Sequence, residues 1–139
     1  MTIHGSCAAR DGAAVLVRGR PGSGKSDLVL RLIDRGFVLV ADDQVEIEGV
    51  SARPPVALAG LLEVRGLGLV RMGFVAPATI RLVVMLDDAA PRLPEPMTDP
   101  ALGVPMVRLE GRSASAAQVV ALALDCVLGQ ARLAVGALT

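Results

Sequence analysis

The sequence of 139 residues contains no tryptophan, no tyrosine and only two phenylalanines. Single-stranded nucleic acid binds by stacking its bases on aromatic side chains, so this composition offers few platforms for RNA or DNA. The chain also lacks an excess of either charge, because 14 Lys and Arg residues balance 14 Asp and Glu residues. A general basic surface is therefore not indicated, and we expect no nucleic-acid partner. Since 53% of the residues are hydrophobic, we expect a core of Val, Leu, Ile and Ala.

Cysteine is equally scarce, with only Cys7 and Cys126, which lie far apart and form no C-x-x-C pattern. Two isolated cysteines predict reduced thiols in a cytoplasmic protein, and residues 1–4 show no basic or apolar region of a secretion signal. The most apolar stretch, residues 114–128, would span about 22 Å as a helix, which is shorter than the ~30 Å hydrocarbon layer of a membrane. We therefore predict a buried helix there and no membrane partner.

One segment matches the phosphate-binding pattern G-x-x-x-x-G-K-[ST] at every fixed position. It reads Gly19-Arg20-Pro21-Gly22-Ser23-Gly24-Lys25-Ser26, and we call residues 19–26 the P-loop segment. Glycines let backbone N–H groups surround an anion, Lys25 brings a positive charge to the β- and γ-phosphates, and the Ser26 hydroxyl can ligate Mg²⁺. An apolar run at 13–17 predicts a buried strand before the segment, and residues 26–35 predict a helix after it. All eight residues are therefore candidates for binding the phosphates of a nucleotide.

The length and the remaining patterns predict a single α/β domain over residues 1–139. We expect further strands at residues 4–9, 37–40, 44–48, 61–65, 80–86 and 107–109. The sequence Arg10-Asp11-Gly12 predicts a hairpin turn, residues 51–55 predict another turn, and Ser113 is the expected N-cap of the last helix. Residues 91–105 contain five prolines and predict a loop that is either functional or disordered.

Nucleotide chemistry needs a second, acidic site, and two apolar strands end in a pair of acids. Residues 37–40 lead into Asp42 and Asp43, and residues 82–86 lead into Asp87 and Asp88. Either pair fits the carboxyl end of a strand beside the P-loop segment, where ligands bind in open α/β sheets. Either pair also fits a solvated acidic turn, so the pattern alone leaves both open.

The absence of an N-K-x-D motif makes a Ras-like GTPase unexpected. Three classes remain. The first is a protein-serine kinase that uses ATP and Mg²⁺, the second is a small-molecule kinase of the P-loop class, and the third is a nucleotide-binding regulatory module. The acceptor of the phosphoryl group separates the first two classes.

Several segments, taken in order, resemble the catalytic domain of HPr kinase/phosphorylase. They are His4-Gly5, the P-loop segment, Val40-Ala41-Asp42-Asp43-Gln44-Val45, Glu63-Val64-Arg65-Gly66-Leu67-Gly68, Val104-Pro105-Met106 and Gly111-Arg112. The P-loop segment is generic, whereas A-D-D followed by E-V-R-G-L-G at this spacing is specific. The short chain is similar to the forms of this family in α-proteobacteria.

The resemblance implies a cytoplasmic enzyme that phosphorylates a seryl residue of HPr, the phosphocarrier protein of the phosphotransferase system, with ATP and Mg²⁺. In many members the same site removes that phosphate with inorganic phosphate and releases pyrophosphate. The implied fold is a mixed sheet with flanking helices, similar to the nucleotide domain of phosphoenolpyruvate carboxykinase. The implied assembly is a homo-oligomer, usually a hexamer.

The resemblance also assigns roles to the first acidic pair and its surroundings. By position, Asp42 is implied to be the base toward the substrate serine and the acid in the reverse direction. Asp43 and His4 are implied to be its supporting neighbours. Adjacent carboxylates near phosphates repel each other, which favours one of them holding a proton and makes such dual duty feasible.

Three further residues acquire roles in the same way. Glu63 resembles the acidic group near the metal, where Ser26 is the other candidate ligand, and Arg65 resembles a phosphate-facing cation. Arg92 corresponds to a mobile-loop arginine linked to the phosphorylase direction. The residues alone allow plainer interpretations, because Glu63 and Arg65 are two apart on a strand and can form a surface ion pair. Arg92 lies among prolines and fits a solvated side chain.

Overall fold

The computed structural model describes residues 1–139, which form one large mixed sheet, two main helices and a separate hairpin. The elements are β1 (Thr2–His4), β2 (Ser6–Arg10), β3 (Ala13–Arg18), α1 (Lys25–Asp34), β4 (Val38–Ala41), β5 (Gln44–Glu48), β6 (Ser51–Arg53), the short 3-10 helix η1 (Val56–Leu58), β7 (Leu61–Val64), β8 (Gly68–Arg71), β9 (Ala78–Leu86), β10 (Met97–Thr98), β11 (Pro105–Leu109) and α2 (Ala116–Val127).

The long strand β9 lies at the centre of the sheet, with β3 parallel to it on one side and β11 parallel to it on the other. Strand β2 pairs antiparallel with both β3 and β4, so β4 runs in the same direction as β3. At the start of β9, β6 pairs antiparallel and leads through β5 to β1. The carboxyl ends of β3, β4, β9 and β11 therefore lie at one edge of the sheet, where ligands bind in α/β folds.

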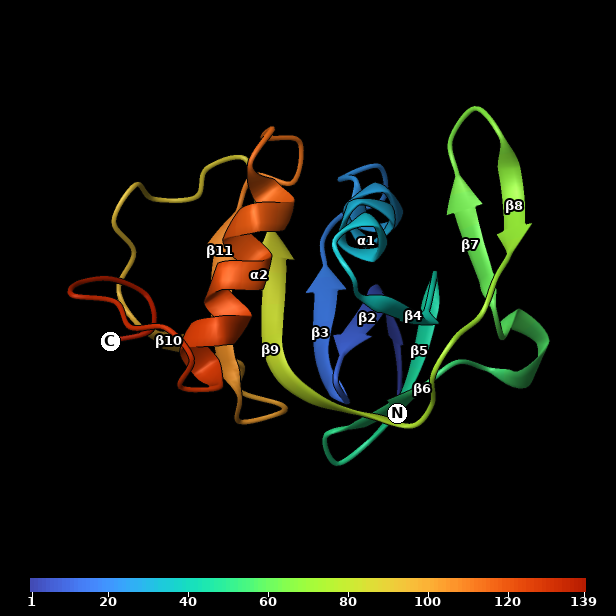
Figure 1. Ribbon diagram of the computed structural model, residues 1–139, viewed down its shortest axis with the longest axis horizontal. Helices are drawn as coiled ribbons and strands as arrows, with labels where there is room; N and C mark the ends of the chain where they lie inside the picture. Colours follow the sequence, from blue (N-terminus) through green and yellow to red (C-terminus); the bar gives the residue numbers. More distant parts are fainter.

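Two hydrophobic clusters cover the two faces of the sheet. Helices α1 and α2 lie side by side over one face, as Figure 1 shows, and Leu32 and Leu124 pack there against strand residues such as Val84. The second cluster joins β2, β3 and β9 to β5 and β6 and includes Leu16 and Ile80. Residues 13–17 of β3 alternate between the two clusters, so the strand is apolar up to Arg18, as expected for a strand buried on both faces.

The structure confirms the hairpin at Asp11 and Gly12, both helices, and the strands expected around residues 13–17, 37–40, 44–48, 61–65, 80–86 and 107–109, with shifts of one to two residues at their ends. The expected single strand at 4–9 is divided at Gly5 into β1 and β2, which pair with different partners. Strand β8, which forms a hairpin with β7, was not expected from the sequence.

Two local predictions are wrong. The expected turn at 51–55 contains β6, which ends before the prolines at 54 and 55 and pairs with both β5 and β9. The N-cap of α2 is Ser115, not Ser113, and its side chain makes no capping hydrogen bond. Ser113 instead lies in the preceding turn, where its amide donates to the Glu110 carbonyl.

Helix α2 is buried on one side only, because Val119 and Leu122 are 46% and 53% exposed. Neither α2 nor any other helix is long and apolar enough to cross a membrane.

The second half of the proline-rich segment is ordered by Asp99, which is 2% exposed. Its carboxylate accepts hydrogen bonds from the amides of Ala101 and Leu102 at 3.1 and 2.9 Å and from the Arg18 guanidinium at 3.4 Å.

Cys7 on β2 is completely buried, and burial raises the pKa of its thiol from 9.0 to about 12. Above 9.0 the thiol of the unfolded chain ionises while that of the folded chain stays neutral, so stability is lost as the pH rises toward 12. Between pH 8 and 10 we expect the free energy of unfolding of the wild type to fall by about 1.4 kcal/mol more than that of Cys7→Ala. Urea denaturation at the two pH values measures the difference, and equal losses would contradict this account of Cys7.

Candidate active site

The P-loop segment joins the end of β3 to the start of α1 and turns through two glycines in the left-handed region. Gly22 has φ 78° and Gly24 has φ 97°, conformations that a residue with a Cβ adopts only at a cost. The Lys25 Nζ donates hydrogen bonds to the carbonyl oxygens of Gly19 and Arg20, both at 3.0 Å. The first amides of α1 have no partner within the helix and, with the helix dipole, favour an anion at this end.

Asp42, directly after β4, is the buried acid of the site, with an exposed fraction of 4%. Its Oδ1 accepts hydrogen bonds from the Ser26 hydroxyl at 2.7 Å and the Ser6 hydroxyl at 2.6 Å. Its Oδ2 accepts one from the amide of Glu63 at 3.0 Å. One carboxylate thus connects α1, β2 and β7 at the carboxyl edge of the sheet, and the hydroxyl that it orients is the candidate metal ligand of the P-loop segment.

Asp43 points in a different direction from its neighbour, because the chain turns sharply between β4 and β5. Its φ of 68° is left-handed, a conformation that Asp adopts more readily than most residues. The turn is fixed by the amide of Gly5, which donates to the Asp43 carbonyl at 3.1 Å. The Asp43 side chain is 62% exposed, and its Oδ1 lies 3.7 Å from the Nδ1 of His4, which is 79% exposed. The two adjacent acids therefore have different surroundings, since Asp42 is buried and accepts three hydrogen bonds while Asp43 is exposed beside a histidine.

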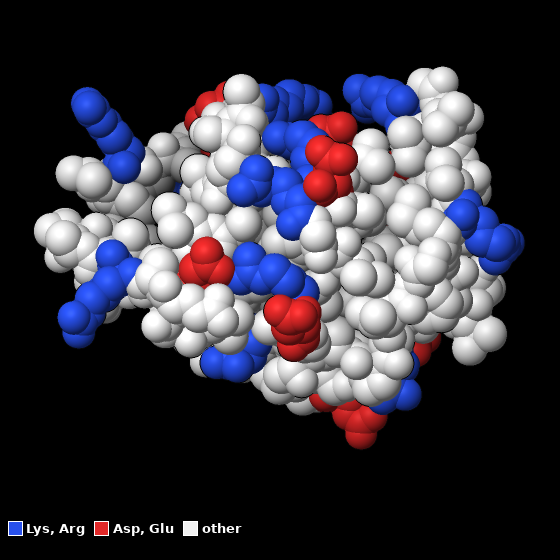
Figure 2. All heavy atoms as spheres, viewed as in Figure 1, with Lys and Arg blue, Asp and Glu red and all other residues white.

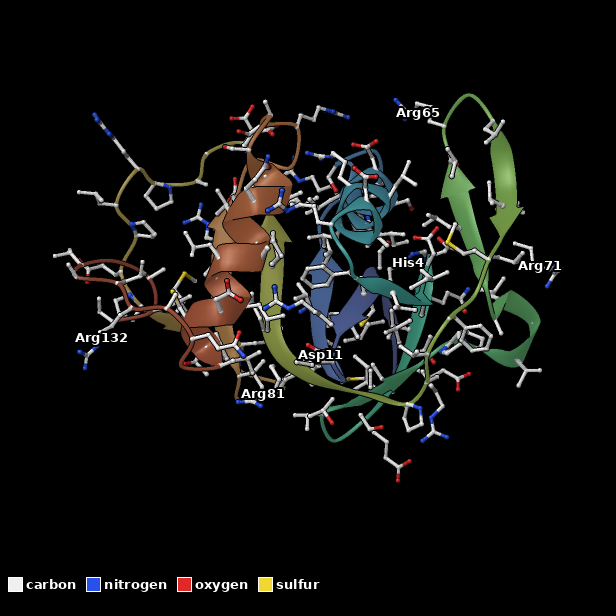
Figure 3. The ribbon with its side chains drawn as sticks, in the orientation of Figure 1. His4, Asp11, Arg65, Arg71, Arg81 and Arg132 are labelled. Atoms are coloured by element: carbon white, nitrogen blue, oxygen red, sulfur yellow. The ribbon has the colours of Figure 1, made fainter.

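The β7–β8 hairpin carries Glu63 and Arg65, both with exposed side chains. Only the backbone of Glu63 contacts Asp42, and Glu63 forms no ion pair with Arg65. In Figure 3, Arg65 extends from the top of the hairpin, whereas His4 lies lower, between α1 and the hairpin in this view. The structure thus brings the backbone of Glu63 into the site and leaves Arg65 free at its rim.

The second acidic pair lies at the end of β9 but is engaged elsewhere. Asp87 accepts hydrogen bonds from the Ala89 amide at 2.9 Å and from the Arg108 Nε at 2.9 Å. These bonds, the Ala89 amide first, hold the pKa of the Asp87 carboxyl below its ordinary value, and the charge of Arg20 contributes. Asp88 is exposed. Of the two pairs that the sequence left open, only the first forms a hydrogen bond with the P-loop segment, through Ser26.

Arg92 is exposed in the segment after β9. It lines a cavity of about 410 Å³ that is bounded by residues 90–94, β11, α2 and the C-terminal residues 133–138. The structure does not bring Arg92 into contact with the other candidate residues.

Three residues at the site were assigned no role from the sequence, although Arg112 lies in one of the segments that carry the resemblance. Ser6 is completely buried and donates to Asp42. Arg31 on α1 donates to the Ser113 carbonyl in the turn before α2, and Arg112 in that turn donates to the Gly22 carbonyl of the P-loop segment. Figure 2 shows that Lys and Arg side chains gather with acidic side chains over α1 and the upper end of α2. No local motif marks Ser6 or Arg31, because their partners lie 36 and about 80 positions away along the chain.

Replacing Asp42 with Ala is expected to lower the free energy of unfolding by about 2–4 kcal/mol, because two hydroxyls and one amide lose a buried acceptor. Asp43→Asn is the matched control, and it should stay within about 0.5 kcal/mol of the wild type since the side chain is exposed and Asn tolerates the same backbone conformation. Urea denaturation measures both. Equal losses in the two variants would show that the hydrogen bonds of Asp42 do not stabilise the fold.

Comparison with known proteins identifies the class of this α/β domain. The HPr Serine kinase C-terminal domain family matches residues 1–89. An HPr kinase/phosphorylase from Aromatoleum aromaticum is 35% identical, with 78% of this chain and 41% of the relative covered. One from Acidovorax sp. is 37% identical, covering 78% and 40%, and one from Bordetella pertussis is 38% identical, covering 76% and 40%. The chain therefore belongs to the HPr serine kinase C-terminal domain family, and it spans about two fifths of the length of these relatives.

A solved structure shows the same fold. The Hpr(Ser) kinase/phosphatase from Coxiella burnetii superimposes with a TM-score of 0.79 at 24% sequence identity, covering 93% of this chain and 92% of that chain. The mixed sheet with flanking helices that the resemblance implied is thus confirmed.

Proposed function

We propose that this protein is a serine kinase that transfers a phosphoryl group from ATP to the phosphocarrier protein HPr. The same site also catalyses the phosphorolysis of phosphorylated HPr. The observation that carries the proposal is the bond between Asp42 and Ser26, which ties an acid to the phosphate-binding loop beside the open Asp43 and His4. The names of the relatives support HPr as the acceptor. The likeness to the nucleotide domain of phosphoenolpyruvate carboxykinase is part of the same proposal.

The residues present fit a bound Mg²⁺. A Mg²⁺ ion that accompanies a nucleotide takes few protein oxygens and completes its shell with water and phosphates. The Ser26 hydroxyl donates its proton to Asp42, so a lone pair of its oxygen remains for the metal. Ser26 would hold the ion, with Glu63 as the acidic group beside it. When bound there, the ion would supply positive charge toward the transferring phosphoryl group.

We assign the acid and base role to Asp43 instead of Asp42, to which the resemblance assigned it. Both carboxylate oxygens of Asp42 are buried and accept hydrogen bonds, whereas the Asp43 carboxylate faces solvent and can reach a protein substrate. In the forward reaction the acceptor serine oxygen bonds to the γ-phosphorus, its proton passes to Asp43, and the bond to the leaving ADP breaks. His4 supports Asp43 by its proximity.

In the reverse direction the roles of the same groups are exchanged. An oxygen of inorganic phosphate bonds to the phosphorus of phosphoserine, the bond to the serine oxygen breaks, and protonated Asp43 returns a proton to that oxygen. The products are serine and pyrophosphate.

Arg65, on the β7–β8 hairpin, serves as a cation for the phosphates, and Arg92 serves the phosphorylase direction. We further propose that residues 1–139 act as one catalytic domain in a cytoplasmic homo-hexamer.

An acceptor-dependent assay tests the proposal. ADP release from Mg·ATP is measured with HPr, with HPr whose acceptor serine is replaced by Ala, and with a panel of nucleosides and sugars. We expect ADP release that depends on HPr and is absent with the Ala variant. Release driven only by a small molecule would identify a small-molecule kinase, and nucleotide binding without release would identify a regulatory module.

A further inference from the structure

The turn between β11 and α2, residues 110–113, packs directly on the P-loop segment. A methyl group built on Gly111 would lie 2.8 Å from Leu86 Cδ1 and 3.2 Å from the Ser23 carbonyl oxygen. A larger residue would crowd the Leu86 side chain and the Ser23 carbonyl, so glycine lets the turn lie close to the loop. The guanidinium of Arg112 donates a hydrogen bond to the Gly22 carbonyl. The turn thus contacts two successive peptide groups of the loop.

These contacts determine the directions of the loop's N–H groups. In a planar trans peptide, the carbonyl of one residue and the N–H of the next point in opposite directions. Because the Ser23 carbonyl oxygen lies close to Gly111, we expect the Gly24 N–H, on the opposite side of that peptide, to point away from the turn, where an anion can accept a hydrogen bond from it. Because the Gly22 carbonyl is held by Arg112, the Ser23 N–H points to the Arg20 carbonyl, to which it donates at 3.0 Å.

Arg31, on the second turn of α1, holds this turn in place. Its Nη1 donates to the Ser113 carbonyl at 3.2 Å, its Nη2 donates to the Gly111 carbonyl, and its Nε donates to Asp27 at 3.1 Å. The side chain is 29% exposed. Each of the three guanidinium nitrogens therefore donates to a protein acceptor, and the pair with Asp27, four residues earlier, orients the group.

We infer that Arg31 is a positioning residue for phosphate binding, which acts through residues 110–113 on the P-loop segment without touching the nucleotide. The inference rests on the proposed function only in that the ligand is a nucleotide. Arg31 fixes the Gly111 and Ser113 carbonyls, the turn fixes the Gly22 and Ser23 carbonyls, and these fix the amides that bind the phosphates. Loss of Arg31 removes the support and leaves the phosphate-binding residues intact.

The test compares Arg31→Gln, Arg31→Lys, Arg112→Gln and the double variant Arg31→Gln/Arg112→Gln with a matched control, Arg53→Gln, which alters an exposed arginine distant in sequence. The dissociation constant of the Mg²⁺ complex of a fluorescent ADP analogue is measured for each. We expect Arg31→Gln to weaken binding by about 5–20-fold, a coupling in the usual range between linked groups. Arg31→Lys should recover only part of it, because a single ammonium does not reproduce the planar fork.

Two results separate positioning from general destabilisation. If both arginines act through one turn, the double variant should lose less than the product of the single losses. The KM for ATP should rise in Arg31→Gln while the KM for HPr stays unchanged. Wild-type affinity in Arg31→Gln, or losses that multiply fully in the double variant, would overturn the inference.

A second measurement keeps the inference testable even if the wild type binds no nucleotide, which would contradict the proposed function alone. In the free protein, ¹⁵N–¹H spectra should show shifted Ser23 and Gly24 amides in Arg31→Gln and unshifted ones in Arg53→Gln. Unshifted loop amides in a folded Arg31→Gln would contradict the role of Arg31 independently of any ligand.

Discussion

Replacing Asp43 with Asn is expected to slow phosphoryl transfer from ATP to HPr by about 10²–10⁴-fold, the usual loss when a general base is removed. Nucleotide affinity should stay close to that of the wild type, because the Asp43 side chain makes no hydrogen bond to the P-loop segment. Asn retains the shape of the side chain and tolerates the left-handed backbone at this position. The loss therefore reports on proton transfer and not on folding.

Rapid-mixing experiments under single-turnover conditions measure this loss, and Asp42→Asn is the matched comparison. Asp42→Asn should reduce stability and nucleotide affinity as well as the rate, because Asp42 holds Ser26 and the backbone of Glu63. If Asp43→Asn transfers phosphate at the wild-type rate while Asp42→Asn is inactive with unchanged affinity and stability, the acid and base role belongs to Asp42.

Replacing Lys25 with Ala should reduce the rate by about 10²–10³-fold, the cost of removing one group that stabilises developing charge, and should also weaken nucleotide binding. The Lys25 ammonium bonds to the carbonyls of Gly19 and Arg20, which places it at the mouth of the loop. Lys25→Arg is the informative control, because its planar fork does not replace a compact ammonium at this position. Calorimetry of Mg·ADP binding and steady-state kinetics measure both effects.

Lys25 is also the only lysine in the sequence. Amine-selective acylation therefore modifies one side chain besides the N-terminal amine, and intact-mass analysis can count the two. We expect Mg·ATP to protect Lys25 and to leave the N-terminal amine reactive. Equal modification with and without nucleotide would contradict a role of Lys25 at the phosphates.

The parts of the site that could be predicted from sequence are those encoded locally. The glycines, Lys25 and Ser26 are spaced by the geometry of one loop, and the flanking strand and helix follow from their apolar patterns. The pattern of an apolar strand leading into two acids indicated both pairs, at 42–43 and at 87–88, and only the structure shows that Asp42 bonds to Ser26. The family resemblance was confirmed, whereas the catalytic roles of the individual residues stay predictions.

The parts that could not be predicted depend on contacts distant in sequence. Asp42 and Asp43 are identical neighbours, and only the turn fixed by the Gly5 amide gives them different surroundings. Strand β6 was missed because the two prolines that follow it dominate the local pattern, while its pairing with β9 is tertiary. Arg31 and the turn at 110–113 are about 80 positions apart in the sequence, so no local motif predicts their contact.

The most direct test of the central claim is transfer of the γ-phosphoryl group to HPr. The protein is incubated with HPr and Mg·ATP labelled at the γ-position, and the labelled HPr peptide is identified by mass spectrometry. The account predicts one phosphoserine on HPr, which inorganic phosphate then removes with release of pyrophosphate. Label that appears only on a small molecule, or no phosphoserine on HPr from a protein that binds Mg·ATP, would contradict it.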